Sequence, residues 1–236
     1  MKKFLLAFGL VFGLSASAFA APFTNGGFEG GLAPWSGTGT FSVGGTFAGQ
    51  VPAGGAAHAI IQTEPGSSTM ATLATTLGTT VGSINGLGVT GTEGSGIAQS
   101  WITGLGANAT IGFGIINVSD TLVNSALLVD NVSVSDDGTL SFTFNFLTDE
   151  LNQAAAFNDT AFLVVNGAVI FLENKNTGPF PVGPGGGFDG GTGPQVFSQQ
   201  FAALANPEPA SMLAWGLIVG VGAVGYRLRK RGKVVA

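Results

Sequence analysis

Short segments in which apolar and polar residues alternate recur along much of the chain. The clearest is residues 140–146, where large apolar side chains alternate with Ser, Thr and Asn at a period of two residues, the pattern of a half-buried strand. The apolar positions are Leu140, Phe142, Phe144 and Phe146. Because burial of each Phe contributes about 2–3 kcal/mol, this apolar face predicts a second sheet that covers it.

Nine further segments have a strand-like pattern, which gives about ten short strands in all. They are residues 23–28, 38–43, 57–63, 97–102, 110–118, 126–134, 160–165, 168–172 and 195–201. Within residues 126–134 we expect four side chains to share one face, namely Leu128, Asp130, Val132 and Val134. Asn166-Gly167 predicts a type I′ hairpin turn, because both central residues of that turn need a positive φ.

Helical signals inside the chain are weak. Residues 70–77 suit either a strand or a helix, residues 81–87 have weak strand character within a Gly-rich connector, and residues 177–194 predict a Gly/Pro loop. Short strands with turn signals between them and no convincing internal helix predict an all-β fold. We expect an antiparallel β-sandwich that is jelly-roll-like.

The two ends of the chain have the patterns of addressing segments. Residues 1–20 contain Lys2 and Lys3, a short apolar core and the small-x-small pair Ala18 and Ala20, which predicts a secretory signal peptide cut before Ala21. Residues 206–236 begin with Asn206-Pro207-Glu208-Pro209 and continue with an uncharged apolar run, residues 210–226. The exported domain is therefore expected to span residues 21–205.

The apolar run of the C-terminal segment predicts one transmembrane helix. As a helix it reaches roughly 26 Å, close to the thickness of a hydrocarbon core. Residues 227–236 form a basic tail, which places the C-terminus in the cytoplasm by the positive-inside rule. The basic cluster of this tail consists of Arg227, Arg229, Lys230 and Arg231.

This tripartite segment resembles the PEP-CTERM sorting signal of Gram-negative bacteria in the type, order and spacing of its parts. The resemblance implies export through the secretory translocon, an inner-membrane-anchored precursor, and processing near Pro207, Glu208 and Pro209 by a membrane protease called an exosortase. The two prolines disfavour helix before them, so we expect the tripeptide to be extended and accessible. The alternative is a permanent anchor in which the tripeptide is an incidental linker.

Charge is distributed unevenly along the chain. Twelve of the 13 acidic residues lie in residues 21–205, together with one of the 8 basic residues, Lys175, so this part carries a net charge of about −11. Such a surface cannot neutralise a phosphate backbone, which excludes nucleic acid as a partner, and it favours cations such as Ca²⁺. The chain contains no cysteine, so an apolar core has to stabilise it without disulfides.

Two internal segments resemble the strands of bacterial carbohydrate-binding jelly-roll modules. They are residues 25–29 (Asn-Gly-Gly-Phe-Glu), with Pro34-Trp35 following, and residues 125–132. Residues 140–150 and 157–167 are similar to surface domains that precede PEP-CTERM tails. In those domains the strand that corresponds to residues 125–132 usually comes last, whereas here it precedes the Phe-rich strand.

The jelly-roll resemblance implies two candidate sites in the exported part. For sugar stacking the candidates are Trp35 and Trp101, although most of the aromatic residues are Phe, which usually belongs to a core. For a structural Ca²⁺ the candidates are Asp149, Glu150 and Asp159, with loop carboxylates and Asx turns as the alternative.

Catalytic patterns are weak. His58, the single histidine, lies in an ordinary strand pattern and is expected to be half-exposed, and nothing marks a nucleophile or an acid–base pair for it. A Gly-rich match to the dinucleotide fingerprint at residues 86–91 lacks the strand and helix that this motif requires. We expect a protein that is not an enzyme and has a structural or adhesive role at the cell surface or in an exopolysaccharide biofilm matrix. The alternative is a lectin-like carbohydrate-binding module supported by Ca²⁺.

Overall fold

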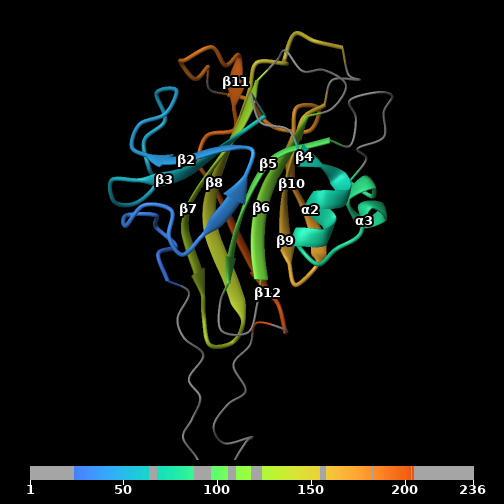
Figure 1. Cartoon of the computed structure of the whole chain (residues 1–236). Coiled ribbons are helices and arrows are strands. Elements are labelled where there is room, and N and C mark those ends of the chain that lie inside the picture. Colours follow the sequence, from blue (N-terminus) through green and yellow to red (C-terminus); the bar gives the residue numbers. More distant parts are fainter. Residues whose placement is uncertain are drawn as a thin grey trace, which may run out of the picture. The chain divides into compact units, whose positions relative to one another are not determined.

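The chain folds into two antiparallel β-sheets of six strands each (Figure 1). The computed structural model describes residues 24–63, 68–87, 97–105, 110–117, 124–154, 158–181, 183–202 and 204. All of these residues belong to one compact unit, Ala21–Ala205. The expectation of an all-β sandwich is therefore confirmed.

Sheet A has the strand order β1-β5-β6-β9-β10, and β4 pairs with β5 on the same side as β1. Its strands are β1 (Ser36–Thr38), β4 (Ser68–Thr69), β5 (Ile97–Leu105), β6 (Thr110–Asn117), β9 (Thr160–Val165) and β10 (Ala168–Asn174). The turn between β9 and β10 has φ values of 48° at Asn166 and 83° at Gly167, as the Asn-Gly pair predicts.

Sheet B has the strand order β11-β8-β7-β3-β2, and β12 continues along the outer side of β8. Its strands are β2 (Thr40–Gly44), β3 (His58–Gln62), β7 (Ser125–Val134), β8 (Thr139–Thr148), β11 (Gly190–Gly191) and β12 (Gln195–Gln200). β7 and β8 form a hairpin in this sheet, while their sequence neighbours β6 and β9 pair with each other in sheet A.

The main core lies between the facing sides of the two sheets. The four apolar side chains of the Phe-rich strand β8 all belong to it, as their alternation predicts. Phe142 contacts Phe113 of sheet A edge to face, with 4.8 Å between the ring centroids. Leu204, close to the end of the described chain, is 5% exposed and also belongs to this core.

A second apolar layer covers the outer side of sheet A. Two short helices, α2 (Met70–Thr76) and α3 (Val81–Asn85), lie beside β9 and β10 in Figure 1. Ala74, Leu77 and Ile84 pack with Phe162 and Val164 of β9. This layer explains why every residue of β9 is buried, since its side chains are covered on both faces.

The two helices correct the sequence-based prediction. Of the ambiguous residues 70–77, Met70–Thr76 are helical, and the prediction of strand character in residues 81–87 is wrong. Thr80 caps α3, since its hydroxyl oxygen accepts a hydrogen bond from the Ser83 amide at 3.0 Å. Burial of Ile84 against sheet A then outweighs the low helix propensity of this segment.

The predicted first strand, residues 23–28, is also wrong for the residues that the structure describes there. Residues 24–27 form turns, and Asn25 and Phe28 have φ values of 56° and 58°. The Asn25 side-chain amide donates hydrogen bonds to the carbonyl oxygens of Gly31 and Ala33 at 2.6 and 2.7 Å. These local bonds stabilise a turn in place of a strand ladder.

The predicted strand at residues 38–43 is two strands in different sheets. Gly39, with a φ of 86°, separates β1 in sheet A from β2 in sheet B. Glycine reaches this conformation without steric cost, so the chain can pass from one sheet to the other within a single residue.

A bulge in β7 contradicts the expected common face of its four side chains. The register with β8 shifts between Asp130 and Ser133, and Asn131 has a φ of 55°. Leu128, before the bulge, packs on the outer side of sheet B, whereas Val132, after it, lies in the main core. One additional residue in a strand reverses the faces of all the side chains that follow it.

Candidate functional site

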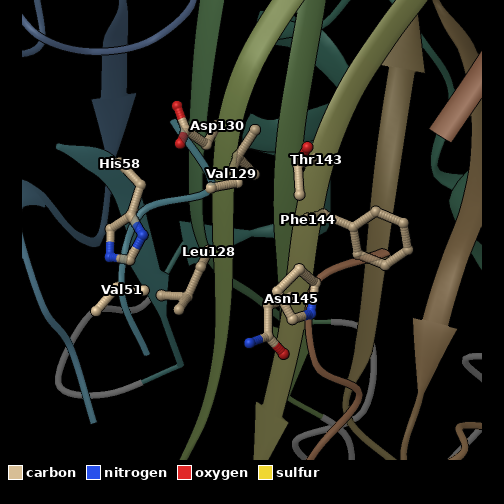
Figure 2. Close-up of a pocket in the computed structure, with 10 residues that line it drawn as sticks. Val51, His58, Leu128, Val129, Asp130, Thr143, Phe144 and Asn145 are labelled. Atoms are coloured by element: carbon tan, nitrogen blue, oxygen red, sulfur yellow. The ribbon is translucent and has the colours of Figure 1, made fainter. Parts of the chain in front are cut away.

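Three polar side chains form a row across the outer side of sheet B (Figure 2). His58 is on β3, Asp130 is on β7 and Thr143 is on β8, where it pairs directly with Asp130. The row follows from the antiparallel register of β3 and β7. Ala59 pairs with Val129, so His58, one residue earlier, lies next to Asp130, one residue later. A histidine, a carboxylate and a hydroxyl therefore lie on one face of the sheet, although 85 positions in the sequence separate His58 from Thr143.

His58 is buried, at 2% exposure, so the expectation that it is half-exposed is wrong. Burial lowers the pKa of its imidazole because the charged form loses its hydration, and the nearby Asp130 carboxylate partly opposes this effect. The Nε2 atom is buried and has no hydrogen-bond partner among the described residues. The side chain is therefore held in its neutral form at pH 7.

Asp130 is 3% exposed and connects the row to the loop that precedes β3. Its carboxylate accepts hydrogen bonds from the backbone amides of Gly54 at 2.8 Å and Asn131 at 2.7 Å. Burial raises the pKa of Asp130, while the bonds from Gly54 and Asn131 and the neighbouring His58 lower it.

A pocket beside this row is too small for a sugar or a cofactor. Val51, Leu128, Asn145 and Pro194 line it together with His58 and Asp130. About 20 Å³ of it is accessible to water, which is room for about one water molecule. The arrangement can hold a proton and one water molecule, and it fixes the loop that contains Gly54.

The same loop is also bonded to the N-terminal turn. One oxygen of the Glu29 carboxylate accepts hydrogen bonds from the amides of Ala56 and Ala57 at 2.9 and 3.1 Å. Gly26, three residues earlier, accepts a hydrogen bond from the Val132 amide at 2.9 Å. The two segments that resemble carbohydrate-binding modules, residues 25–29 and 125–132, are thus in direct contact.

The two tryptophans proposed for sugar stacking have different positions in the structure. Trp35 is 4% exposed and packs between Phe28 and Phe113, with centroid distances of 5.2 and 5.8 Å. Its indole N–H donates to the Asn25 carbonyl oxygen at 3.1 Å, so Trp35 is a core residue and not an exposed platform. The backbone of Trp101 pairs with Thr38 and Gly114, and its side chain lies outside the described part.

The proposed Ca²⁺ residues lie near one another around residues 149–159. The Asp159 amide donates to a carboxylate oxygen of Glu150 at 3.2 Å, and both residues are buried. Asp149 accepts a hydrogen bond from the Asn124 amide at 3.1 Å. Within the described residues, no cluster of three or more Asp, Glu or His side chains is arranged to hold a metal ion.

Lys175 stabilises the loop beside these carboxylates. Its ammonium group donates to the carbonyl oxygens of Gln153 and Ala154 at 2.9 and 2.7 Å. Its backbone amide donates to the carbonyl oxygen of Asp159 at 3.3 Å. Lys175, the single Lys or Arg of residues 21–205, is therefore bonded to backbone groups of its own chain.

The two segments predicted to address the chain lie outside the described residues. These include the predicted cleavage residues Ala18 and Ala20, the tripeptide Pro207, Glu208 and Pro209, the apolar run and the basic cluster. Among the helices that the structure describes, none has the length and apolar character needed to cross a membrane.

The pairing of His58 with Asp130 is the feature that sequence reasoning missed. The segment Ala57-His58-Ala59-Ile60 shows the strand, but only the register of β3 against β7 shows which residue lies beside the imidazole. Comparisons with known protein families, with curated proteins and with solved structures found no match to this chain.

Proposed function

We propose that the chain is an exported surface or extracellular-matrix protein that is sorted, and processed, at its C-terminal segment by an exosortase. The observation that carries this proposal is the sequence of residues 206–236, in which Pro207-Glu208-Pro209, an apolar run and a basic cluster follow one another. The tail residues then serve as a substrate for another enzyme, and the mature product reaches the cell surface or the matrix.

The character of the described domain supports a non-enzymatic role. Its buried polar row at His58 and Asp130 opens on a pocket that admits about one water molecule. Its charged side chains bond to backbone groups of its own loops, as Glu29, Asp130 and Lys175 do. These features stabilise a β-sandwich, and we propose that this sandwich is the structural or adhesive material that the cell displays.

We propose a jelly-roll relationship for the strand order. The support is the nested pairing in which the β7–β8 hairpin of sheet B lies inside the β6–β9 pair of sheet A. A chain that wraps in this way passes between the two sheets on each side of the hairpin, as it does in a jelly roll. Only this one nested pair is present among the described strands. The next strands outward, β5 and β10, do not pair with each other, because they lie on opposite sides of β6 and β9 in sheet A.

The experiment that tests the sorting proposal replaces Glu208 with Ala in the full chain in a producing Gram-negative host. We expect an unprocessed, membrane-retained precursor, measured by intact mass of the membrane and extracellular fractions. Asp136→Ala is the matched control, because Asp136 is an exposed acid in the β7–β8 turn and should not affect processing. Normal release of the Glu208→Ala variant, or recovery of wild-type protein outside the cell with residues 227–236 attached, would contradict the proposal.

The alternative is a carbohydrate-binding module supported by Ca²⁺. The observation that favours it is the hydrogen bond between Val132 and Gly26, which joins the two segments that resemble such modules. With Trp35 in the core, Trp101 is the stacking residue that this alternative requires. Binding to a glycan array that Trp101→Ala abolishes, and a rise in Tm on addition of Ca²⁺ that Asp159→Asn abolishes, would favour this function over a purely structural one.

A further inference from the structure

β12 (Gln195–Gln200) is the outermost strand of sheet B next to β8, and in the described part of the chain nothing pairs with its other side. The Phe201 amide donates to the Gly138 carbonyl oxygen at 2.9 Å. Because every second residue of an antiparallel strand directs its backbone N–H and C=O groups to the same neighbour, this bond shows which residues of β12 face β8. Residues 195, 197 and 199 therefore direct their backbone groups to β8. The N–H and C=O groups of Val196, Ser198 and Gln200 point away from the sheet.

The strand is held firmly on the sandwich. The Phe197 ring stacks on Phe142 with 4.8 Å between the centroids, and the hydroxyl groups of Ser198 and Ser141 are hydrogen-bonded at 3.0 Å. The Gln200 side chain donates to the Asp137 carbonyl oxygen at 2.9 Å. A partner strand would therefore meet a preorganised edge and would lose little free energy in ordering it.

β12 lacks the features that normally protect an edge strand from pairing with another chain. Edge strands are usually short, charged, interrupted by Pro or bulged. Residues 195–200 contain no charge and no Pro, their register with β8 is regular, and Val196 is 78% exposed. The outer strand of sheet A, β10, differs, because it carries Glu173 and a register shift after Phe171.

We propose that β12 pairs with β12 of a second copy of this chain, antiparallel and about a two-fold axis through Ser198. Ser198 then lies opposite Ser198 of the second copy, and Val196 lies opposite Gln200. All three outward-facing residues enter hydrogen-bonded pairs in this register, and sheet B continues from one copy into the other. The proposal does not rest on the processing of the tail.

The edge formed by β12 is compatible in charge with a second copy, because the strand itself carries none. Each exported part carries a net charge of about −11, so two copies repel one another across most of their surfaces. β12 is an uncharged strand of six residues, which allows two copies to approach without bringing like charges together. A two-fold pairing is also self-complementary, because the same three residues supply the donors and acceptors on both sides.

The test uses the absence of cysteine from the chain. Ser198→Cys in the full chain places one thiol at the proposed axis, and Ser42→Cys places one on β2, at the opposite edge of sheet B, where the side chain is also exposed. Cells that export each variant are treated with a short bis-maleimide crosslinker, and the precursor and any processed product are analysed by mass. We expect a species of twice the chain mass from Ser198→Cys and none from Ser42→Cys.

Three outcomes would overturn the proposal. Absence of a crosslink from Ser198→Cys would show that two β12 strands do not meet, and equal crosslinking of both variants would show random encounter or association through another segment. A Ser198→Cys adduct of any other mass would show that a different protein occupies the edge. Since precursor and product are read separately, failure of tail processing does not affect this result.

A second measurement does not need a crosslinker. Ser198→Glu places two carboxylates directly opposite each other at the axis, and we expect association about fivefold weaker because like charges opposite each other destabilise a strand pair. Sedimentation equilibrium of the exported protein measures this change, with Ser42→Glu as the matched control and circular dichroism as the check on folding. Unchanged association of folded Ser198→Glu would also overturn the proposal.

Discussion

His58 and Asp130 occupy neighbouring positions of β3 and β7 on the outer side of sheet B (Figure 2), and each influences the pKa of the other. Asp130 favours the protonated form of His58, but burial of the ring has the larger effect and disfavours it. Because His58 is the single histidine, its ring is the histidine contribution to the pH dependence of stability in the mildly acidic range.

The first prediction is that acidification destabilises the fold through His58. Its pKa is lower in the folded chain than in the unfolded chain, so the unfolded state binds a proton more readily below about pH 6.5. Stability is therefore lost as the pH falls below this value. Urea unfolding at pH 7.5 and at pH 5.5 measures the loss, and His58→Gln should reduce the difference between the two pH values. A difference of unchanged size in that variant would contradict the assignment to His58.

The second prediction concerns the effect of Asp130 on His58. Asp130→Asn keeps the size of the side chain and removes its charge, so the pKa of His58 should fall further below its ordinary value. The NMR titration of the single imidazole in the wild-type chain and in the variant measures this shift. A rise in the His58 pKa would show that the carboxylate does not stabilise the charged ring.

The third prediction concerns the contact between the two sheets. Phe142 contacts Phe113, Phe144 and Phe197, so Phe142→Ala should lower the free energy of unfolding by about 3–5 kcal/mol. Val196→Ala, at an exposed position of the same sheet, should change it by less than about 0.5 kcal/mol. Chemical denaturation measures both variants, and equal losses would show that Phe142 does not lie in the core.

The fourth prediction concerns the β9–β10 turn. Gly167 has a φ of 83°, and a Cβ atom there would overlap the Gly78 carbonyl oxygen, so Gly167→Ala should destabilise the fold by about 1–3 kcal/mol. Gly183→Ala is the control, because a Cβ atom at that position meets no other atom within 4 Å. Thermal unfolding of the two variants measures the difference, which should be absent if the turn has another geometry.

Where one rule determined the local structure, the sequence was sufficient. The alternation in residues 140–146 predicted which side chains of β8 enter the core, and Asn166-Gly167 predicted the turn between β9 and β10. Both signals depend on neighbouring residues alone, which is why they can be read without knowledge of the remaining chain.

The errors arose where tertiary contacts or single residues decided the outcome. α3 is helical because Ile84 packs against the apolar outer side of sheet A. That tertiary contact cannot be predicted from residues 81–87 alone. Asn131 reverses the faces of β7, and Gly39 divides one predicted strand between two sheets. From the sequence alone, a residue that can adopt a positive φ is compatible with a continuous strand, a bulge or a break, and only the partner strand decides among them.

The candidate site could be predicted only in part. The sequence singled out His58 as the single histidine and placed Asp130 only on the face of a strand, and the register of β3 against β7 is what makes them neighbours. The sequence predicts an exposed ring for Trp35, whereas its position between Phe28 and Phe113 follows from the turn around Asn25. Long-range pairing determines such neighbours, and no spacing along the chain specifies it.

Under the proposed cleavage of the C-terminal segment, burial of Leu204 limits how far the product can be shortened from its C-terminal end. This side chain belongs to the main core, and Pro207 follows it by only three positions. A carboxypeptidase that digests the released protein should stall close to Leu204, because its removal would open a hole in the sandwich. Packing of Leu204 would thus protect the C-terminus that the proposed cleavage produces. The released protein would then have a uniform C-terminus even if the first cut occurred at more than one bond.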